Sequence, residues 1–220
     1  MTRQAKPRVD TSRKADVRAV YGATGSAKSS YVKKELKRLK CSRVIIWDPV
    51  DEYGELPNII KVTRATELVD LLRRYPKGAL KVRFVTSDFS LFELWARCAF
   101  SWCNAAVVAE EIADVTTPSK APPWWGQVIR KGRARGLAPI FGLSQRPAEA
   151  DKTLLGNATL VRCGRLTRAK DRKMMADEMD IDPKQISKLV PLEYVQKDMN
   201  TNVVIKGAID KRKTEQIPTN

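Results

Sequence analysis

The chain has 220 residues, of which 43% are hydrophobic, so it is long and apolar enough to fold around a sizeable core. Its 41 lysines and arginines outnumber 25 acidic residues, and the net charge of +16 favours a polyanionic partner: nucleic acid first, an anionic membrane surface second. A basic enzyme with no such partner is the alternative. Because histidine is absent and the four cysteines form no C-x-x-C pair, neither a zinc site nor a disulfide framework is expected.

The N-terminal residues, 1–16, are polar and basic, and we expect them to form a flexible arm. They lack the apolar core of a secretory signal. The sequence contains no apolar run of ~18 residues, so no membrane-spanning helix is expected. Such an arm would touch nucleic acid or a neighbouring subunit, or it would simply remain solvated. The first element expected to fold is an apolar strand over 17–21.

The strand leads into Gly22-Ala-Thr-Gly25-Ser-Ala-Lys28-Ser29, and a helical pattern follows over 31–40. Strand, glycine-bearing loop, lysine, hydroxyl and helix are the parts of a phosphate-binding P-loop. Lys28 would reach the β- and γ-phosphates and the Ser29 hydroxyl would bind Mg²⁺, while backbone N–H groups at the helix N-terminus receive the anion. The expected phosphate-binding residues are Gly22, Ala23, Thr24, Gly25, Ser26, Ala27, Lys28, Ser29 and Ser30.

One position departs from the usual G-x-x-x-x-G-K-[ST] pattern. Ala27 stands where the second glycine is usual, and its methyl group narrows the conformations open to the loop. A chance glycine turn ahead of a basic helix is the alternative, but the lysine, the serine and both flanking elements favour the P-loop.

Strands and helices are expected to alternate along the rest of the chain. Apolar runs predict strands over 43–48, 58–62, 80–86, 105–109, 138–143 and 158–163. Helical spacing of apolar residues predicts helices over 66–75, 89–102, 128–135, 168–179 and 182–188. A small hairpin pairs 194–196 with 203–205, and a flexible tail occupies 210–220. The pattern predicts an α/β fold with one mostly parallel sheet, helices on both faces, a C-terminal hairpin, and a single ATPase domain over 17–209.

Two acids follow the predicted strand over 105–109 and complete a Walker B pattern, Val107-Val108-Ala109-Glu110-Glu111. Glu110 would hold Mg²⁺ directly or through water, although aspartate is usual at this position. Glu111 would polarise the attacking water. Two solvated acids at a strand end are the alternative, and a separation of about 80 residues from the P-loop favours the Walker B interpretation.

Polar residues also follow two other predicted strands, at the end where ligands bind in open α/β sheets. Asp48-Pro-Val-Asp51-Glu52-Tyr53-Gly54 follows one of them, and Ser144-Gln145-Arg146-Pro147 follows the other. Gln145 would bond the γ-phosphate or the attacking water, and would thereby sense whether the phosphate is present. A polar strand end without a function is the alternative.

A polar loop with two tryptophans is expected between these motifs, at Pro122-Pro123-Trp124-Trp125-Gly126. An exposed tryptophan pair would anchor a partner protein or provide a platform on which bases stack. The alternative, slightly favoured, is a loop packed against its own domain.

Taken together, the P-loop, W-D-P-V-D-E-Y-G, V-V-A-E-E, G-R-A-R-G and L-S-Q-R-P resemble the FtsK–HerA superfamily of DNA-pumping ATPases. The nearest branch is the genome-packaging ATPases of tectivirus-type, internal-membrane viruses. The resemblance implies a RecA-like ASCE P-loop core that works as a ring, usually a hexamer, with ATP sites at subunit interfaces. Asp48 and Glu52 match the acidic loop of that family.

The resemblance also implies that an arginine of the neighbouring subunit completes each site. Arg133 is the first candidate, and Arg135 and Arg146 are the next. A cation that arrives only on assembly would stabilise charge developing on the γ-phosphoryl group. Contacts to a nucleic-acid backbone, or plain surface charge, are the alternative for each arginine.

The motifs predict an ATP-hydrolysing site that binds ATP and Mg²⁺. The resemblance implies a motor that translocates double-stranded DNA without reading its sequence and packages a viral genome into a preformed capsid. Expected partners are duplex DNA, further copies of the chain, and capsid or vertex proteins, in the host cytoplasm or at the packaging vertex of the virion. Residues 87–88 and 116–120 are candidates for gripping DNA in the ring pore. The alternatives are a P-loop nucleotide or nucleoside kinase, and a non-catalytic DNA- or assembly-binding protein with a degenerate P-loop.

Overall fold

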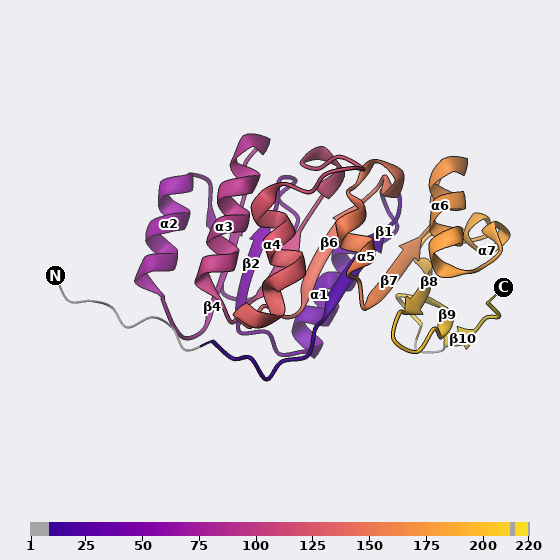
Figure 1. The fold of residues 1–220 in the computed structure, drawn as a ribbon, viewed down its shortest axis with the longest axis horizontal. Helices are drawn as coiled ribbons and strands as arrows, with labels where there is room; N and C mark the ends of the chain where they lie inside the picture. Colours follow the sequence, from indigo (N-terminus) through magenta and orange to yellow (C-terminus); the bar gives the residue numbers. More distant parts are fainter. Residues whose placement is uncertain (1–8, 212–213, 220) are drawn as a thin grey trace.

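One ten-stranded sheet runs through the described part of the chain (Figure 1). The computed structural model describes residues 9–211 and 214–219. The strand order is β10-β9-β8-β7-β1-β6-β5-β2-β4-β3. The strands are β1 (Val17–Tyr21), β2 (Arg43–Trp47), β3 (Ile59–Val62), β4 (Leu80–Phe84), β5 (Ala106–Ala109), β6 (Ile140–Ser144), β7 (Leu160–Gly164), β8 (Glu193–Asp198), β9 (Val204–Ala208) and β10 (Thr214–Gln216).

The strands from β7 across to β3 are parallel, whereas β8, β9 and β10 extend one side of the sheet in antiparallel fashion. Tyr21 pairs with Ser144 and Trp47 pairs with Ala109, so β1 ends level with β6 and β2 ends level with β5, while Ala109 pairs with Gly142 of β6. The segments that follow these strands are therefore brought together at one edge of the sheet. The predicted mostly parallel sheet with a C-terminal hairpin is confirmed.

In the described part of the chain, seven helices connect the strands. They are α1 (Lys28–Arg38), α2 (Ala65–Arg74), α3 (Phe92–Trp102), α4 (Pro123–Lys131), α5 (Lys152–Gly156), α6 (Ala169–Met179) and α7 (Pro183–Ser187). Short 3-10 turns lie at Phe89–Leu91, Ile112–Asp114, Gly132–Arg135 and Pro147–Glu149. Among the described residues, no helix is both long enough and apolar enough to cross a membrane.

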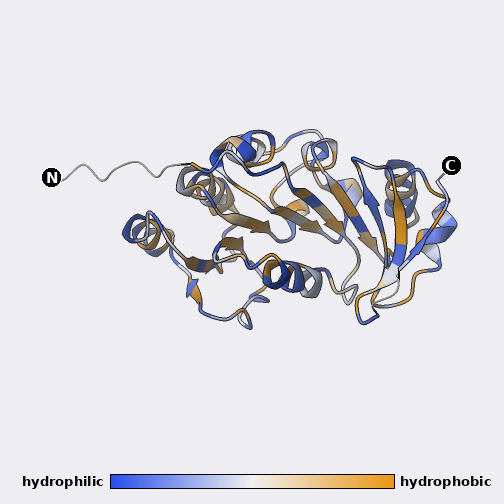
Figure 2. Cartoon of the chain, turned by 90° about the horizontal axis from the view of Figure 1, so that it is seen from below, coloured by the Kyte–Doolittle hydropathy of each residue, from blue (hydrophilic) through white to orange (hydrophobic). Residues whose placement is uncertain are grey.

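The two faces of the sheet are covered unequally. Alternate residues of a strand point to opposite faces, and each face has its own core. Trp47 and Val107 share a large core with apolar residues of α2 to α7, whereas Val44 and Val108 share a smaller one with α1 and Tyr53. Figure 2 shows the hydrophobic strands lying between these helical layers. We call the two sides the multi-helix face and the α1 face.

The tryptophan pair lies in a helix, so the prediction of a loop there is wrong. α4 begins at Pro123, because proline, with its fixed φ and its missing N–H, suits the first helical position. Trp125 is fully buried, with its ring 5.7 Å from that of Phe92 and 6.3 Å from that of Trp95. Trp124 is half-buried against the same core. Trp125 is therefore part of the packing of the multi-helix face, not an exposed anchor.

The ends of the chain contact the domain where they are described. Of the predicted arm, residues 1–8 lie outside the described residues, while the Asp10 N–H donates to Asn104 Oδ1 at 2.8 Å and Arg13 donates to the Ala138 carbonyl oxygen at 3.0 Å. In the predicted tail, β10 pairs with β9, and residues 212, 213 and 220 lie outside the described residues. The domain limits at 17 and 209 stay predictions.

Candidate nucleotide-binding site

The loop between β1 and α1 passes twice through left-handed backbone conformations. Gly25 has a φ of 77°, and Ala27 has φ 62° and ψ 32°. This conformation costs a residue with a side chain roughly 1 kcal/mol, whereas glycine adopts it freely. Ala27 thus takes the backbone that the missing glycine would favour. α1 begins at the next residue, and its first turn presents the unpaired N–H groups that bind anions.

Three strand ends fix the position of this loop. The Gly22 N–H donates to the Ser144 carbonyl oxygen at 3.2 Å, and the Ala23 N–H donates to the Arg165 carbonyl oxygen at 2.8 Å. Within the loop, Lys28 Nζ donates to the Gly22 carbonyl oxygen at 2.9 Å. A phosphate would offer the ammonium group a charged acceptor in place of this carbonyl, and charge-assisted bonds are the stronger ones.

Gln145 connects the P-loop with the second of the paired acids. Thr24 Oγ1 donates to Gln145 Oε1 at 2.8 Å, and Gln145 Nε2 donates to Glu111 Oε1 at 2.7 Å. The Gln145 N–H also points to Glu111 Oε2 at 3.4 Å. Glu111 has a positive φ of 47°, which turns its side chain away from the strand direction that Glu110 follows. The sequence-predicted sensor, Walker B acid and P-loop therefore meet at one place.

Glu110 is the buried member of the acid pair, with 1% of its surface exposed. Burial raises its pKa to about 7, against the opposing effects of a hydrogen bond from Tyr53 and the charge of Lys28. The Tyr53 hydroxyl donates to Glu110 Oε1 from the α1 face, and burial, followed by the Glu110 charge, raises the pKa of Tyr53. This contact fixes one carboxylate oxygen and leaves the other available for a ligand.

The acidic loop after β2 reaches the P-loop through a second contact. The Ser29 hydroxyl donates to Glu52 Oε2, which leaves the lone pairs of the Ser29 oxygen free for a cation. Ser29, Glu52 and Glu110 supply only oxygen atoms, the ligands that Mg²⁺ prefers. Mg²⁺ in nucleotide sites takes one or two protein groups along with phosphates and waters, so these residues fit it.

Asp48 holds the acidic loop in shape. Its carboxylate is fully buried and accepts the N–H groups of Glu52 at 2.8 Å and Tyr53 at 3.2 Å. Arg83 of β4 donates to the same carboxylate at 3.1 Å and also to Asp51. Sequence reasoning gave no role to Tyr53 or Arg83. The available signals were the tyrosine of the D-P-x-x-E-Y motif and a charged residue inside an apolar strand.

The three candidate arginines have different surroundings. Arg135 donates to the Phe100 and Ser101 carbonyl oxygens at 3.1 and 3.3 Å, so it caps the end of α3. Arg146 lies beside the site and is ion-paired with Glu149 at 3.1 Å. Arg133 is exposed, and within the described chain no hydrogen bond or ion pair engages its side chain.

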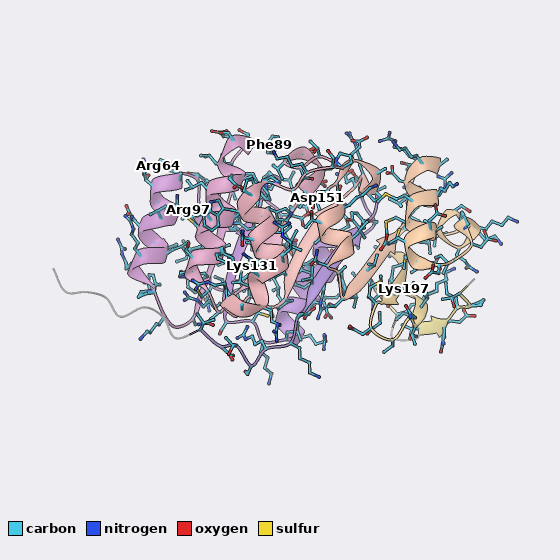
Figure 3. The ribbon with its side chains drawn as sticks, viewed as in Figure 1. Arg64, Phe89, Arg97, Lys131, Asp151 and Lys197 are labelled. Atoms are coloured by element: carbon cyan, nitrogen blue, oxygen red, sulfur yellow. The ribbon has the colours of Figure 1, made fainter. Side chains whose placement is uncertain are left out.

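Arg133 also lies at the opposite edge of the sheet from its own P-loop. It belongs to the turn at Gly132–Arg135, which precedes β6, and the two ends of β6 are roughly 15 Å apart. In Figure 3, Lys131 marks this lower edge, and Phe89, which follows β4, marks the upper one. The structure therefore separates Arg133 from the site of its own subunit and does not bring the two together.

The two candidate DNA-gripping segments lie at the upper edge with the P-loop. Residues 87–88 follow β4, and Phe89 next to them is 44% exposed. Residues 116–120 follow β5, and Thr117 bridges to Lys120 through paired backbone hydrogen bonds of 3.2 and 3.0 Å. Both segments are accessible from the side where the nucleotide would bind.

The fold and this edge define a P-loop NTPase with a RecA-like ASCE core. No protein-family model matches the chain. The chain belongs to the family of protein P9 of Pseudoalteromonas phage PM2, to which it is 34% identical over 184 residues, covering 80% of this chain and 82% of that protein.

Solved structures agree on the fold. The genome packaging NTPase B204 of Sulfolobus turreted icosahedral virus 2, in complex with AMPPCP, superposes with a TM-score of 0.68 at 16% identity, over 87% of this chain and 96% of that one. VirB4 of Thermoanaerobacter pseudethanolicus superposes with a TM-score of 0.59 at 12% identity, over 96% and 92% of the two chains. The predicted likeness in fold to a viral packaging NTPase is confirmed.

Proposed function

We propose that the protein is an ATP-hydrolysing motor that moves double-stranded DNA and packages a viral genome into a preformed capsid. The observation that carries this proposal is the pair of hydrogen bonds by which Gln145 joins Thr24 of the P-loop to Glu111. A glutamine in this position would contact both the γ-phosphate and the acid that orients the attacking water. Kinship with a phage protein and a shared fold with a viral packaging NTPase support the biological setting.

Each residue would have one task in hydrolysis. Lys28 and the first-turn N–H groups of α1 would bind the β- and γ-phosphates, and Glu111 would accept a hydrogen bond from the attacking water. Ser29 and Glu110 would hold Mg²⁺, directly or through water, and Mg²⁺ when bound neutralises charge that develops on the phosphate oxygens. Tyr53 would keep the Glu110 carboxylate in its place.

The site would be completed by a second subunit. Arg133 is too far from its own P-loop to act there, yet it is exposed at the opposite edge, where a neighbour in a ring would meet it. Its charge would stabilise the transferring phosphoryl group only when the neighbour is docked. The net charge of +16 suits a ring that grips phosphates of duplex DNA without reading bases.

The decisive experiment measures ATPase activity with and without duplex DNA, together with the mass of the active species. A ring whose turnover rises on DNA addition supports the motor. Transfer of the γ-phosphate to a nucleoside, with no effect of DNA, would replace it with a kinase. Nucleotide binding without any turnover would replace it with a binding protein.

A mixing experiment tests the arginine. Arg133→Ala and Lys28→Ala proteins are each expected to be inactive, because one lacks the cation and the other lacks the phosphate ligand. Mixed rings contain interfaces with a native P-loop beside a native Arg133, so part of the activity returns. Arg135→Ala and Arg146→Ala serve as matched partners. If one of these proteins behaves like Arg133→Ala in the mixture and Arg133→Ala stays active, the assignment moves to that arginine.

A further inference from the structure

Among the residues that the structure describes, one buried cation has neither a carboxylate partner nor a set of backbone carbonyl acceptors. Among the described residues, the buried cationic side chains are Arg18, Arg43, Arg83, Arg162 and Lys197. Three of them form ion pairs with carboxylates, and Arg43 donates to five backbone carbonyl oxygens. Arg162 has neither. Because burying an uncompensated charge is unfavourable, this exception calls for a ligand that supplies the missing charge.

Arg162 is held in a fixed orientation without being neutralised. It lies on β7 with 7% of its surface exposed, and its guanidinium carbon is 4.1 Å from the ring centre of Tyr31 and 3.2 Å from that of Tyr194. One N–H group donates to Gln196 Oε1 at 3.0 Å. Burial lowers the pKa of Arg162. Two tyrosine side chains and one amide thus orient a planar donor fork, and no carboxylate accepts from it in the described chain.

Arg18, a second buried arginine, has its charge compensated by carboxylates. Arg18 donates to Asp16 at 2.6 Å and to Glu35 at 2.5 Å. Glu35 also accepts from Arg38 at 2.7 Å. Glu35 is therefore already shared by two arginines, and although its charge acts on Arg162, the two form no ion pair in the described chain.

Arg18 and Arg162 line one cavity, and this cavity is strongly basic. It has a volume of about 340 Å³ and is lined by residues of α1 and of strands β7, β8 and β9, on the α1 face. Its wall carries one carboxylate and five cationic residues: Arg18, Lys34, Arg38, Arg162 and Lys211. We propose that this cavity is a binding site for a phosphate group, separate from the P-loop, with Arg162 as its central donor.

Phosphate is the anion that this geometry suits. A guanidinium presents parallel N–H groups that match phosphate oxygens in bidentate fashion, and Lys34 and Lys211 at the rim add charge without fixed geometry. The phosphate belongs either to the DNA backbone or to a small phosphorylated molecule. Tyr31, which stacks on Arg162, lies on α1 three residues after Lys28, so an occupant of the cavity touches the helix that begins at the P-loop.

The test compares Arg162→Met with Arg74→Met, which removes an equal charge from an exposed position at the end of α2. Pyrophosphate binding is followed as a rise in Tm, with both variants placed in a Lys28→Ala background so that the P-loop does not contribute. Duplex binding is followed by anisotropy of a labelled DNA over a range of salt concentrations. Loss of the charge-assisted contact is expected to weaken binding by about tenfold.

Each outcome decides the proposal. If Arg162→Met alone loses the pyrophosphate-dependent rise in Tm and keeps native DNA affinity, the ligand is a small phosphorylated molecule. If Arg162→Met alone weakens DNA binding and lowers the salt slope by about one, the ligand is the DNA backbone. If both variants behave alike in both assays, the proposal is overturned. Should Arg162→Met fail to fold, the exposed pair Lys34→Met and Lys211→Met is compared with Arg74→Met by the same criteria. DNA-stimulated ATPase activity of the native protein is a separate readout, so failure here leaves the proposed motor standing.

Discussion

On the multi-helix face, six helices cover the sheet, with Trp95 packed against Trp47 and Trp125 packed against Trp95, whereas on the α1 face a single helix covers the central strands. That single helix leaves a cavity on each of its flanks, of about 340 Å³ beside β7 to β9 and about 760 Å³ beside β2 and β4. Because stabilisation follows the apolar area removed from water, the two faces differ in what they contribute. The multi-helix face supplies most of the stability, while the thinly covered α1 face begins at the P-loop and holds Tyr53 and Arg162.

The largest effect is expected at the nucleotide-binding edge of the sheet, next to the start of α1. Glu111→Gln should lower kcat for ATP roughly 10²–10⁴-fold, because a positioned general base contributes that much, while Tm and ATP affinity stay native. Asp70→Asn, an exposed substitution on α2, is the control and should change nothing. Native turnover of the Glu111→Gln protein would remove this residue from the mechanism.

A stability loss of about 3–5 kcal/mol is expected when the core of the multi-helix face is emptied by Trp125→Ala. The adjacent Trp124→Ala is the matched control, and it should cost less than half as much because this side chain is only half-buried. Urea unfolding measures both free energies. Equal losses for the two variants would contradict the proposed packing.

A smaller, pH-dependent effect is expected at Asp151, the residue that caps α5 over the multi-helix face (Figure 3). Its Oδ1 accepts the Leu154 N–H at 3.2 Å, its Oδ2 is buried without a hydrogen bond in the described chain, and burial raises its pKa. At low pH the carboxyl is protonated in both the folded and the unfolded state. As pH rises through the raised folded pKa, the native state must bury a charge, and stability falls.

Asp151→Asn should therefore gain about 1 kcal/mol near neutral pH and almost nothing near pH 3.5, because asparagine keeps the cap without the charge. Thermal unfolding across that pH range measures the difference. A gain that is constant with pH would show that charge burial is not the cause.

The smallest effect is expected at the start of the helix on the α1 face. Ala27→Gly relieves the strain of the left-handed backbone conformation, but it also raises the conformational entropy of the unfolded chain. These effects oppose each other, so the free energy of unfolding should change by less than about 0.5 kcal/mol. ATP affinity, measured by calorimetry, should stay within about threefold of native. A large gain in affinity would mean that the methyl group obstructs the phosphates.

The sequence alone was sufficient to predict the sheet and the meeting of the main motifs at one of its edges. Runs such as that of β2 are β-branched and apolar on both sides, which only a buried strand tolerates. Because the polar ends of parallel strands meet at one edge of the sheet, the sequence predicts Gln145 and Glu111 near the P-loop. The hypothesis that these residues hydrolyse ATP remains to be tested.

Other contacts depend on which strands pair although they are distant in the chain. No local sequence pattern predicts that pairing. Arg83 reaches Asp48 because β4 lies beside β2, and Arg162 meets Tyr194 and Tyr31 because β7 lies between β8 and β1. The five-residue α5 is too short to show a helical period. The paired prolines before Trp124 predict a loop, because proline is common in turns, but proline is also common at the first position of a helix.

The position of Arg133, at the far edge from the P-loop, gives the subunit a polarity. If this arginine completes a neighbour's site, contacts must run head to tail, and an open row always ends in one copy whose site lacks its arginine. Two copies in such a row would contain one complete site, and only closure would make the number of complete sites equal the number of copies. Activity per chain would then increase with protein concentration and level off when the circle closes, so specific activity itself would report assembly.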